Sequence, residues 1–231
     1  MITKHPYVGN DFSDDNTIWK YFPLPAFLAL LEDKMLYFTR ASYLTDPYEF
    51  PITEKDAEQF LFSMDDYKKT IEQIKAKTFI NCWRISDYES FGMWNAYSDS
   101  TTGIAIKTDV KSLFESFKDI QPDIPTVYAM RVKYVDSLKE TTQNPGDKLN
   151  LEYIVTTKTK PYLNECELRL KFEDAHKKFE EGSYIGVSVD TKTLIKEVFV
   201  GSSSEPYVPN LITKILNRYG INSPVMRSIV K

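Results

Sequence analysis

The segments that read as strands and helices in this sequence do not alternate in a regular strand–helix–strand order. A strand is expected over Thr17 to Phe22, followed by a helix that Pro23 and Pro25 open and by a second strand from Met35. Farther along, the strands expected over residues 183–190 and 195–201 have only a short connection between them. This order favours an α+β fold with a mixed, largely antiparallel, split or curved sheet and flanking helices.

The remaining pattern predicts elements along the whole chain, with no internal repeat, low-complexity tract or long linker, so we expect a single domain over residues 1–231. Further strands are expected over residues 78–85, 103–107, 127–136, 164–173 and 225–230. Further helices are expected over residues 54–77 (one helix or two), 89–99, 109–117, from about 149 to 160, and 209–220. Residues 42–51 and 137–148 read as loops because prolines interrupt them.

Charge and cysteine content restrict the kind of partner and the compartment. The net charge of −4 argues against a broad, non-specific nucleic-acid binder, although the last 26 residues carry only basic charges. Only Cys82 and Cys166 are present, each in an apolar run typical of reduced, buried thiols. The N-terminal segment has no signal-peptide pattern, and no run approaches 18 apolar residues. We therefore expect a soluble, cytoplasmic protein without a membrane partner.

Several familiar catalytic motifs are missing. No phosphate-binding glycine loop occurs, and the chain has only 8 glycines. Its two histidines, His5 and His176, have no metal-ligand neighbour at helical spacing and no accompanying nucleophile motif. We expect no structural metal. Aromatic residues are abundant instead, with 15 Tyr, 14 Phe and 3 Trp, so a ring-lined pocket is plausible beside their usual place in the core.

The segment NECELRLKFE, residues 164–173, places charges at every second position of an expected strand. Glu165, Glu167 and Arg169 would share one face because side chains alternate along a strand. They would form either a solvated surface row, with an ion pair worth less than about 1 kcal/mol, or the floor of a polar site.

A series of short motifs resembles a widespread bacterial family of uncharacterised proteins, known only as a domain of unknown function. The motifs are D-P-x-E from Asp46, M-W-x-x-Y from Met93 and E-x-E-x-R from Glu165, within a match over about residues 18–201. Two positions depart from the family pattern, namely Thr45 before the Asp-Pro pair and Tyr162 before the paired acids.

More distantly, the order of elements resembles the ADP-ribosyltransferase fold. That resemblance implies an NAD-dependent enzyme that modifies a nucleic acid or a protein, as a toxin or a phage-defence effector, with Glu167 as catalytic acid and Glu165 as its substrate-orienting neighbour. Arg40 would be the early basic residue. Candidate residues for NAD binding are the aromatics Tyr21, Tyr37, Trp94 and Tyr97 and the arginines Arg40, Arg84 and Arg169.

Two other classes of function fit the same residues. A metal-dependent nuclease would use Asp46 and Glu49 with the paired acids and Lys171. A non-catalytic binding or regulatory module would use the paired acids and Arg169 for structure only. Asp46 and Glu49 would either line a pocket or belong to a simple turn without a function of its own.

Overall fold

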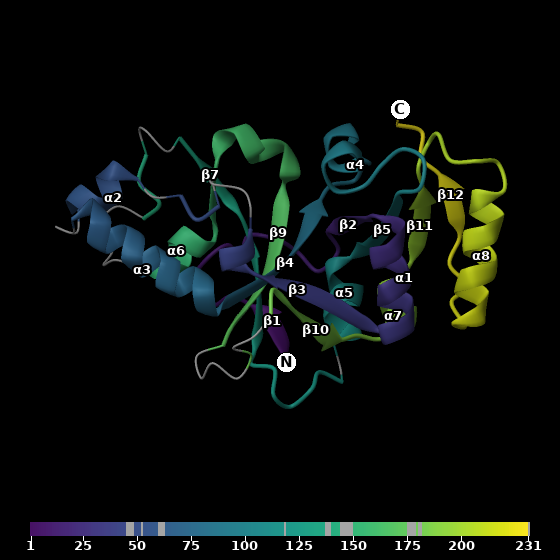
Figure 1. Cartoon of the computed structure of the whole chain (residues 1–231), viewed down its shortest axis with the longest axis horizontal. Coiled ribbons are helices and arrows are strands. Elements are labelled where there is room, and N and C mark those ends of the chain that lie inside the picture. Colours follow the sequence, from purple (N-terminus) through teal and green to yellow (C-terminus); the bar gives the residue numbers. More distant parts are fainter. Residues whose placement is uncertain are drawn as a thin grey trace.

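The computed structural model describes residues 1–44, 49–51, 53–59, 63–117, 119–136, 140–143, 150–174, 179 and 182–230. Within these residues, the protein has a large mixed sheet with helices on both faces (Figure 1), which confirms the expected α+β class. No helix of the described part is long and apolar enough to cross a membrane. The single-domain organisation stays a prediction.

The main sheet contains ten strands in the described part, in the order β1-β6-β9-β4-β2-β5-β11-β12, with β3 and β10 on a branch from β4. Strands β1 and β6 are parallel, as are β11 and β12, and the other pairs are antiparallel. A second, parallel pair of strands lies apart from this sheet. The strands of the main sheet are β1 (Ile2–Lys4), β2 (Thr17–Phe22), β3 (Met35–Arg40), β4 (Thr78–Ile85), β5 (Ile104–Asp109), β6 (Val127–Arg131), β9 (Glu167–Glu173), β10 (Tyr184–Ser188), β11 (Glu197–Val200) and β12 (Val225–Arg227), and the separate pair is β7 (Lys133–Val135) and β8 (Thr157–Thr159).

One edge of β4 is shared by two strands, and the sheet splits between them. Strand β3 pairs with the first half of β4 at Phe79 and Ile80, whereas β2 pairs with its end at Arg84 and Ile85. Among the described strands, residues 81–83 have no partner on this edge. Because β2 and β3 diverge from β4 here, a gap opens in the middle of the sheet, and buried backbone groups along it need other partners.

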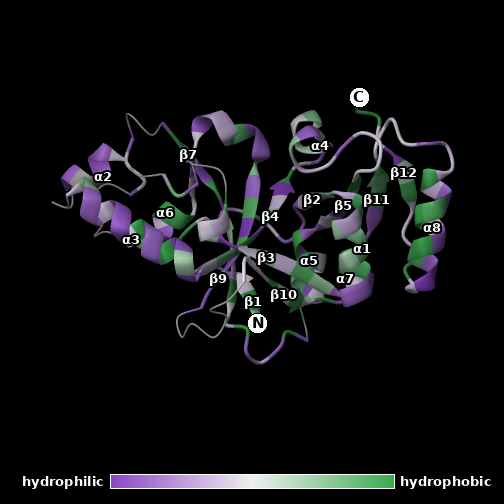
Figure 2. Ribbon diagram, viewed as in Figure 1, coloured by the Kyte–Doolittle hydropathy of each residue, from purple (hydrophilic) through white to green (hydrophobic). Residues whose placement is uncertain are grey.

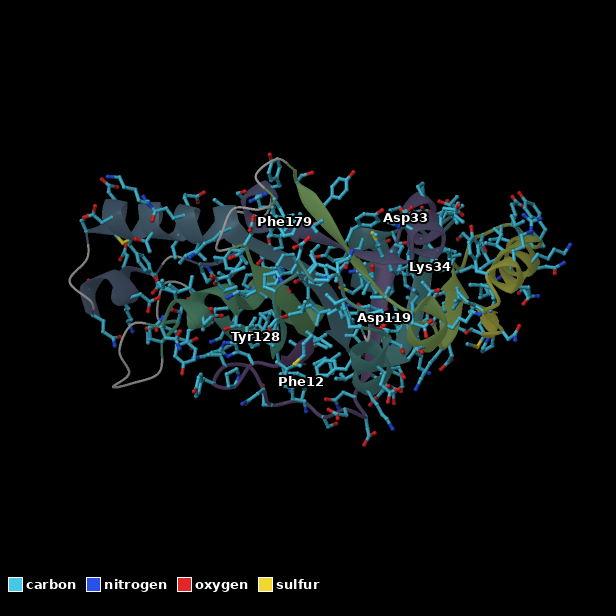
Figure 3. The ribbon with its side chains drawn as sticks, turned by 90° about the horizontal axis from the view of Figure 1, so that it is seen from below. Phe12, Asp33, Lys34, Asp119, Tyr128 and Phe179 are labelled. Carbon is cyan, nitrogen blue, oxygen red and sulfur yellow. The ribbon has the colours of Figure 1, made fainter. Side chains whose placement is uncertain are left out.

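The helices are α1 (Leu24–Asp33), α2 (Glu54–Gln59), α3 (Met64–Lys77), α4 (Phe91–Tyr97), α5 (Val110–Ser116), α6 (Leu151–Val155), α7 (Thr191–Leu194) and α8 (Val208–Arg218), with 3-10 turns η1 (Ala41–Tyr43) and η2 (Lys160–Glu165). Their ends follow local chemistry. Proline occupies the first turn of α1, and Lys34, labelled in Figure 3, follows the helix with a left-handed φ of 52°. Ser63 and Ser90 cap α3 and α4 through their hydroxyls.

The main hydrophobic core lies on one face of the sheet. It joins Phe27 of α1, Leu113 of α5, Leu194 of α7 and Ile212 of α8 with the inward side chains of the strands, such as Leu170. In Figure 2 much of α8 is green and apolar, whereas α3 is largely purple and hydrophilic. Burial of these apolar side chains stabilises the fold. The other face of the sheet makes different contacts.

Two smaller clusters cover the opposite face. Trp94 of α4 packs on Trp19 and Tyr21 of β2, and Ile71 of α3 packs near Ile154 of α6. Between these two clusters lies the polar face of β9. The sheet therefore presents a charged strip that is flanked by apolar packing on both sides.

Several predicted boundaries were wrong. The expected strand over residues 127–136 divides into β6 and β7, which belong to different sheets. The expected helix to about Lys160 ends at Val155, where β8 and η2 take over. The expected strand from Asn164 starts only at Glu167, because Cys166 adopts a left-handed φ of 45°. Strand β1 was not predicted, and most of the expected loop at residues 137–148 lies outside the described residues.

Candidate functional site

A cavity of about 210 Å³ lies at the split in the sheet. Its walls come from Trp19–Tyr21 of β2, Tyr37 and Thr39 of β3, and Ile80–Trp83 of β4, with Tyr97 of α4. A second cavity of about 230 Å³ shares Lys20, Tyr21, Tyr37, Asn81 and Tyr97 with it and is otherwise lined by apolar residues from the end of β2 through α1 to β3. Small-molecule sites usually have about 300–1,000 Å³, so each cavity alone would take one part of such a ligand.

Three carboxylates of the first cavity converge on the ammonium group of Lys158. Its Nζ lies 2.6 Å from Glu49 Oε1, 2.5 Å from Glu165 Oε2 and 3.3 Å from Glu167 Oε2. Burial alone would lower the pKa of Lys158, but Glu167 and Glu49 raise it above its usual range. An isolated bridge between the backbones of Glu49 and Lys158 sets the position of Glu49.

Arg169 lies directly beneath this cluster and is fully buried. Its Nε donates to Glu167 Oε1 at 2.7 Å, its Nη2 to Glu49 Oε2 at 2.8 Å, and its Nη1 to the Val155 carbonyl at 2.6 Å. Burial would raise the pKa of Glu167, yet Arg169 and Lys158 outweigh it and hold this pKa at about 2. The charged strip of β9 is therefore the floor of a polar site rather than a solvated surface row.

Glu165 differs from the other two acids in its exposure. Its side chain is 15% exposed, against 6% for Glu49 and 3% for Glu167. It ends η2, and the left-handed turn at Cys166 takes it out of the strand register. Tyr97 Oη donates to Glu165 Oε1 at 2.8 Å. Glu165 is thus the carboxylate of this cluster that is most open to a molecule in the cavity.

Three of the four predicted aromatic residues line the cavity. Tyr21, Tyr37 and Tyr97 belong to its wall, and Tyr21 Oη accepts from the Ser90 backbone N–H at 2.9 Å. Burial raises the pKa of Tyr21 to about 12, so this hydroxyl stays protonated. Trp94 does not line either cavity but packs edge-to-face on Tyr21 at 5.2 Å. Its role is to support the wall.

None of the three predicted arginines lines either cavity. Arg40 donates to the carbonyls of Gly182, Ala76 and Phe179 (labelled in Figure 3), and its guanidinium lies 4.5 Å from the Phe79 ring centre. Arg84 Nη1 donates to the Asn164 carbonyl at 2.7 Å. Both guanidinium groups tie segments of the chain together. Arg169 lies behind the cavity wall, where it holds the carboxylates of Glu49 and Glu167.

Other residues of the site were missed from the sequence. Lys158 lies in a stretch that reads as helix, although the β-branched threonines of TTKTKP were a signal for the strand that forms there. Lys20 and Asn81 occupy the walls of the split, and Asn81 Nδ2 donates to the Tyr37 carbonyl at 2.7 Å. Burial raises the pKa of the Cys82 thiol, which also lines the cavity. A split between strands has no signature in the sequence.

The geometry does not support the residues of the nuclease hypothesis. In the described part of the chain, no three His, Cys, Asp or Glu side chains form a group that could hold a metal ion. The acids of the cavity surround Lys158 and Arg169 instead, and Lys171 pairs with Glu152 at 2.5 Å. Asp46 lies outside the described residues.

Two solved structures resemble the chain weakly. Both are DarT of Thermus sp. 2.9, one in complex with carba-NAD+ (10% identity, 95% of this chain and 97% of that chain covered, TM-score 0.38) and one with NAD+ (8% identity, 94% and 97% covered, TM-score 0.38). At this level of similarity, nothing about activity follows for the present chain. No curated protein matches the chain significantly.

A family model supports the resemblance that the motifs indicate. Residues 93–181 match the model described as "Protein of unknown function (DUF2971)". This range includes M-W-x-x-Y and E-x-E-x-R. It does not include D-P-x-E at residues 46–49, and it covers only part of the expected match at residues 18–201. Over residues 93–181, the chain is therefore similar to a protein family of unknown function.

Proposed function

We propose that the chain is an NAD-binding enzyme of the ADP-ribosyltransferase type, with its site in the split between β2 and β3. The observation that carries this proposal is the cavity at the split, where tyrosine rings from three elements face a cluster of carboxylates. A planar nicotinamide ring needs an aromatic wall, and the adjoining ribose needs a hydrogen-bond acceptor. The cavity offers both within one opening.

The reaction would replace one bond at the ribose. The bond between ribose C1′ and the nicotinamide nitrogen breaks, its electron pair leaves with neutral nicotinamide, and an acceptor oxygen of a protein, a nucleic acid or water bonds to C1′ while releasing its proton. C1′ gains positive charge in this step, which a fixed carboxylate stabilises. We assign this role to Glu165, because its carboxylate is the most exposed of the three.

Glu167, the first choice from the sequence, has a supporting role in this proposal. Both of its oxygens accept from Arg169, at 2.7 Å and 3.1 Å, and one also faces Lys158. Glu167 therefore fixes Lys158, and Lys158 in turn orients Glu165. Tyr97 holds the second oxygen of Glu165. This arrangement prepares the carboxylate before the ligand enters, which lowers the cost of reorganisation in the transition state.

Nicotinamide release from NAD+ tests the proposal. Wild-type protein should release nicotinamide, and Glu165→Gln should lose most of this activity while remaining folded. Glu197→Gln is the matched control, since Glu197 pairs with Lys107 on β5 and lines neither cavity. Saturating NAD+ at about 100 times its dissociation constant should add about 2.7 kcal/mol to the stability of the folded state. Equal turnover in wild type and Glu165→Gln would contradict the proposal, and stabilisation without turnover would favour a binding module.

A further inference from the structure

Lys20 is a cation without a carboxylate partner in the split. Its Nζ donates to the Cys82 carbonyl at 2.9 Å, and it lies 5.6 Å from the Trp83 ring centre and 5.7 Å from that of Phe22. Among the described residues, no carboxylate oxygen lies within 4.0 Å of this nitrogen. A lysine ammonium has three N–H donors, so the Cys82 carbonyl accounts for only one of them.

The position of Lys20 connects the two cavities. It lines both of them, together with Tyr21 and Asn81. Residues on β2 alternate between the faces of the sheet, and Lys20 belongs to the same face as Ile18 and Phe22 of the main core. Its ammonium nevertheless reaches the unpaired edge of β4, so a ligand that passes from one cavity to the other would lie against it.

The other cations near the site are already occupied. Lys158 and Arg169 are held by the acids of the cluster, and Arg40 and Arg84 bind backbone carbonyls. Among the described residues that line these cavities, Lys20 is therefore the positive charge available to an anionic group of a ligand. The cluster acids would repel such a group from the floor of the first cavity.

We propose that Lys20 binds a phosphate group of a nucleotide ligand that spans the two cavities, an inference that rests on the proposed function for the identity of that nucleotide. The aromatic wall would take the ring and the carboxylates the sugar hydroxyls, while Lys20 would supply the positive charge that the phosphate needs. Phosphate binding by lysine depends on charge and needs no planar fork, which suits a single ammonium in a narrow split.

The protonation of Lys20 agrees with this role. Burial lowers the pKa of Lys20 to about 8, although Cys82 and Glu167 partly offset this effect. The side chain thus remains mostly protonated at neutral pH. A buried ammonium without a counter-ion carries an unrelieved cost of desolvation, and a bound phosphate would relieve it.

Calorimetric titration with ADP and with nicotinamide tests the role of Lys20 directly. Wild-type protein should bind ADP, and Lys20→Gln, which keeps a donor for the Cys82 carbonyl but removes the charge, should bind it at least about tenfold more weakly, a change of about 1.4 kcal/mol. Nicotinamide, which has no phosphate, should bind equally to both. Lys196→Gln is the matched control because Lys196 pairs with Asp109 and lines neither cavity.

The salt dependence of ADP binding shows whether the affinity comes from a charge contact with the phosphate or from packing in the split. Affinity should fall with rising ionic strength in wild type and less steeply in Lys20→Gln, because a phosphate contact has been removed. Equal ADP affinity in Lys20→Gln and wild type, or no ADP binding by wild type, would overturn the inference. ADP binding through Lys20 without nicotinamide release from NAD+ would refute the proposed function and leave this inference standing.

Discussion

The two faces of strand β9 are both buried, but different forces stabilise them. On one face, Leu168, Leu170 and Phe172 pack into the main hydrophobic core. On the other face, Glu167 and Arg169 are equally inaccessible to solvent and are held by ion pairs and hydrogen bonds. Because successive side chains of a strand point to opposite faces, β9 carries an apolar layer on one side and a polar layer on the other.

The polar face costs stability that the apolar face does not. Burying charges costs several kcal/mol per ion, and a buried ion pair often contributes no more than an apolar pair of the same size. The apolar face needs no such compensation. A charged face that is retained inside the protein, beside a cavity with tyrosine walls, is therefore a candidate for function rather than for stability.

Arg169→Met should be the most destabilising change on the polar face. It would leave Glu49 and Glu167 buried without a guanidinium between them, at an expected cost of about 3–5 kcal/mol in the free energy of unfolding. Urea denaturation measures this cost. Arg131→Met is the control, because that arginine is largely exposed and pairs with Asp11 at the surface. A loss below about 1 kcal/mol for Arg169→Met would mean that the network is not formed.

Leu170→Ala should weaken the apolar face by about 3 kcal/mol, within the range for fully buried leucines. The loss comes from the removed apolar contacts and from the remaining cavity. It should be the same at pH 4 and pH 7, because no titratable group is removed. A loss that depends strongly on pH would show that the two faces are coupled rather than independent.

The polar face should instead respond to acid through Glu167. Its folded-state pKa of about 2 lies below the ordinary value of 4.5, so its stabilisation is fully present above pH 4.5 and disappears as the pH falls towards 2. One pKa unit corresponds to about 1.4 kcal/mol, so the difference between 4.5 and about 2 gives a loss on the order of 3 kcal/mol. Stability curves from pH 5 to pH 2 should be shallower for Glu167→Gln than for wild type. Parallel curves would contradict the ion pairing of Glu167.

Tyr97→Phe should have the smallest effect on stability, about 0.5–1.5 kcal/mol, since it removes one hydrogen bond to Glu165. Thermal melting measures that loss, with the largely exposed Tyr7→Phe as control. In the proposed enzyme, the same change should also slow nicotinamide release, because Glu165 loses one of its two supports. Unchanged turnover would mean that Tyr97 lines the cavity without assisting Glu165 in the reaction.

Much of the fold was predictable because local signals were strong. The prolines at the start of α1 and the apolar runs of β2 and β4 correctly predicted these elements. The failures have a common cause. Residues 151–165 change element type within a few residues, and residues 127–135 pass from one sheet to another, because tertiary contacts override a weak local pattern.

The site was predictable in its charges but not in its geometry. Alternation placed Glu167 and Arg169 together, but the sequence could not position Val155 of α6 and Phe50, which contact Arg169. Lys20 escaped notice because a single lysine in a strand reads as a surface residue, and Lys158 because its stretch reads as helix. Their importance comes from the split in the sheet, which depends on how β2 and β3 share β4.

A crystal structure of the protein with NAD+ would test the central claim most directly. The account predicts the nicotinamide ring between Tyr21, Tyr37 and Tyr97, a ribose hydroxyl within hydrogen-bond distance of Glu165, and a phosphate oxygen at Lys20. A ligand bound outside the split, or an empty split at saturating NAD+, would contradict it.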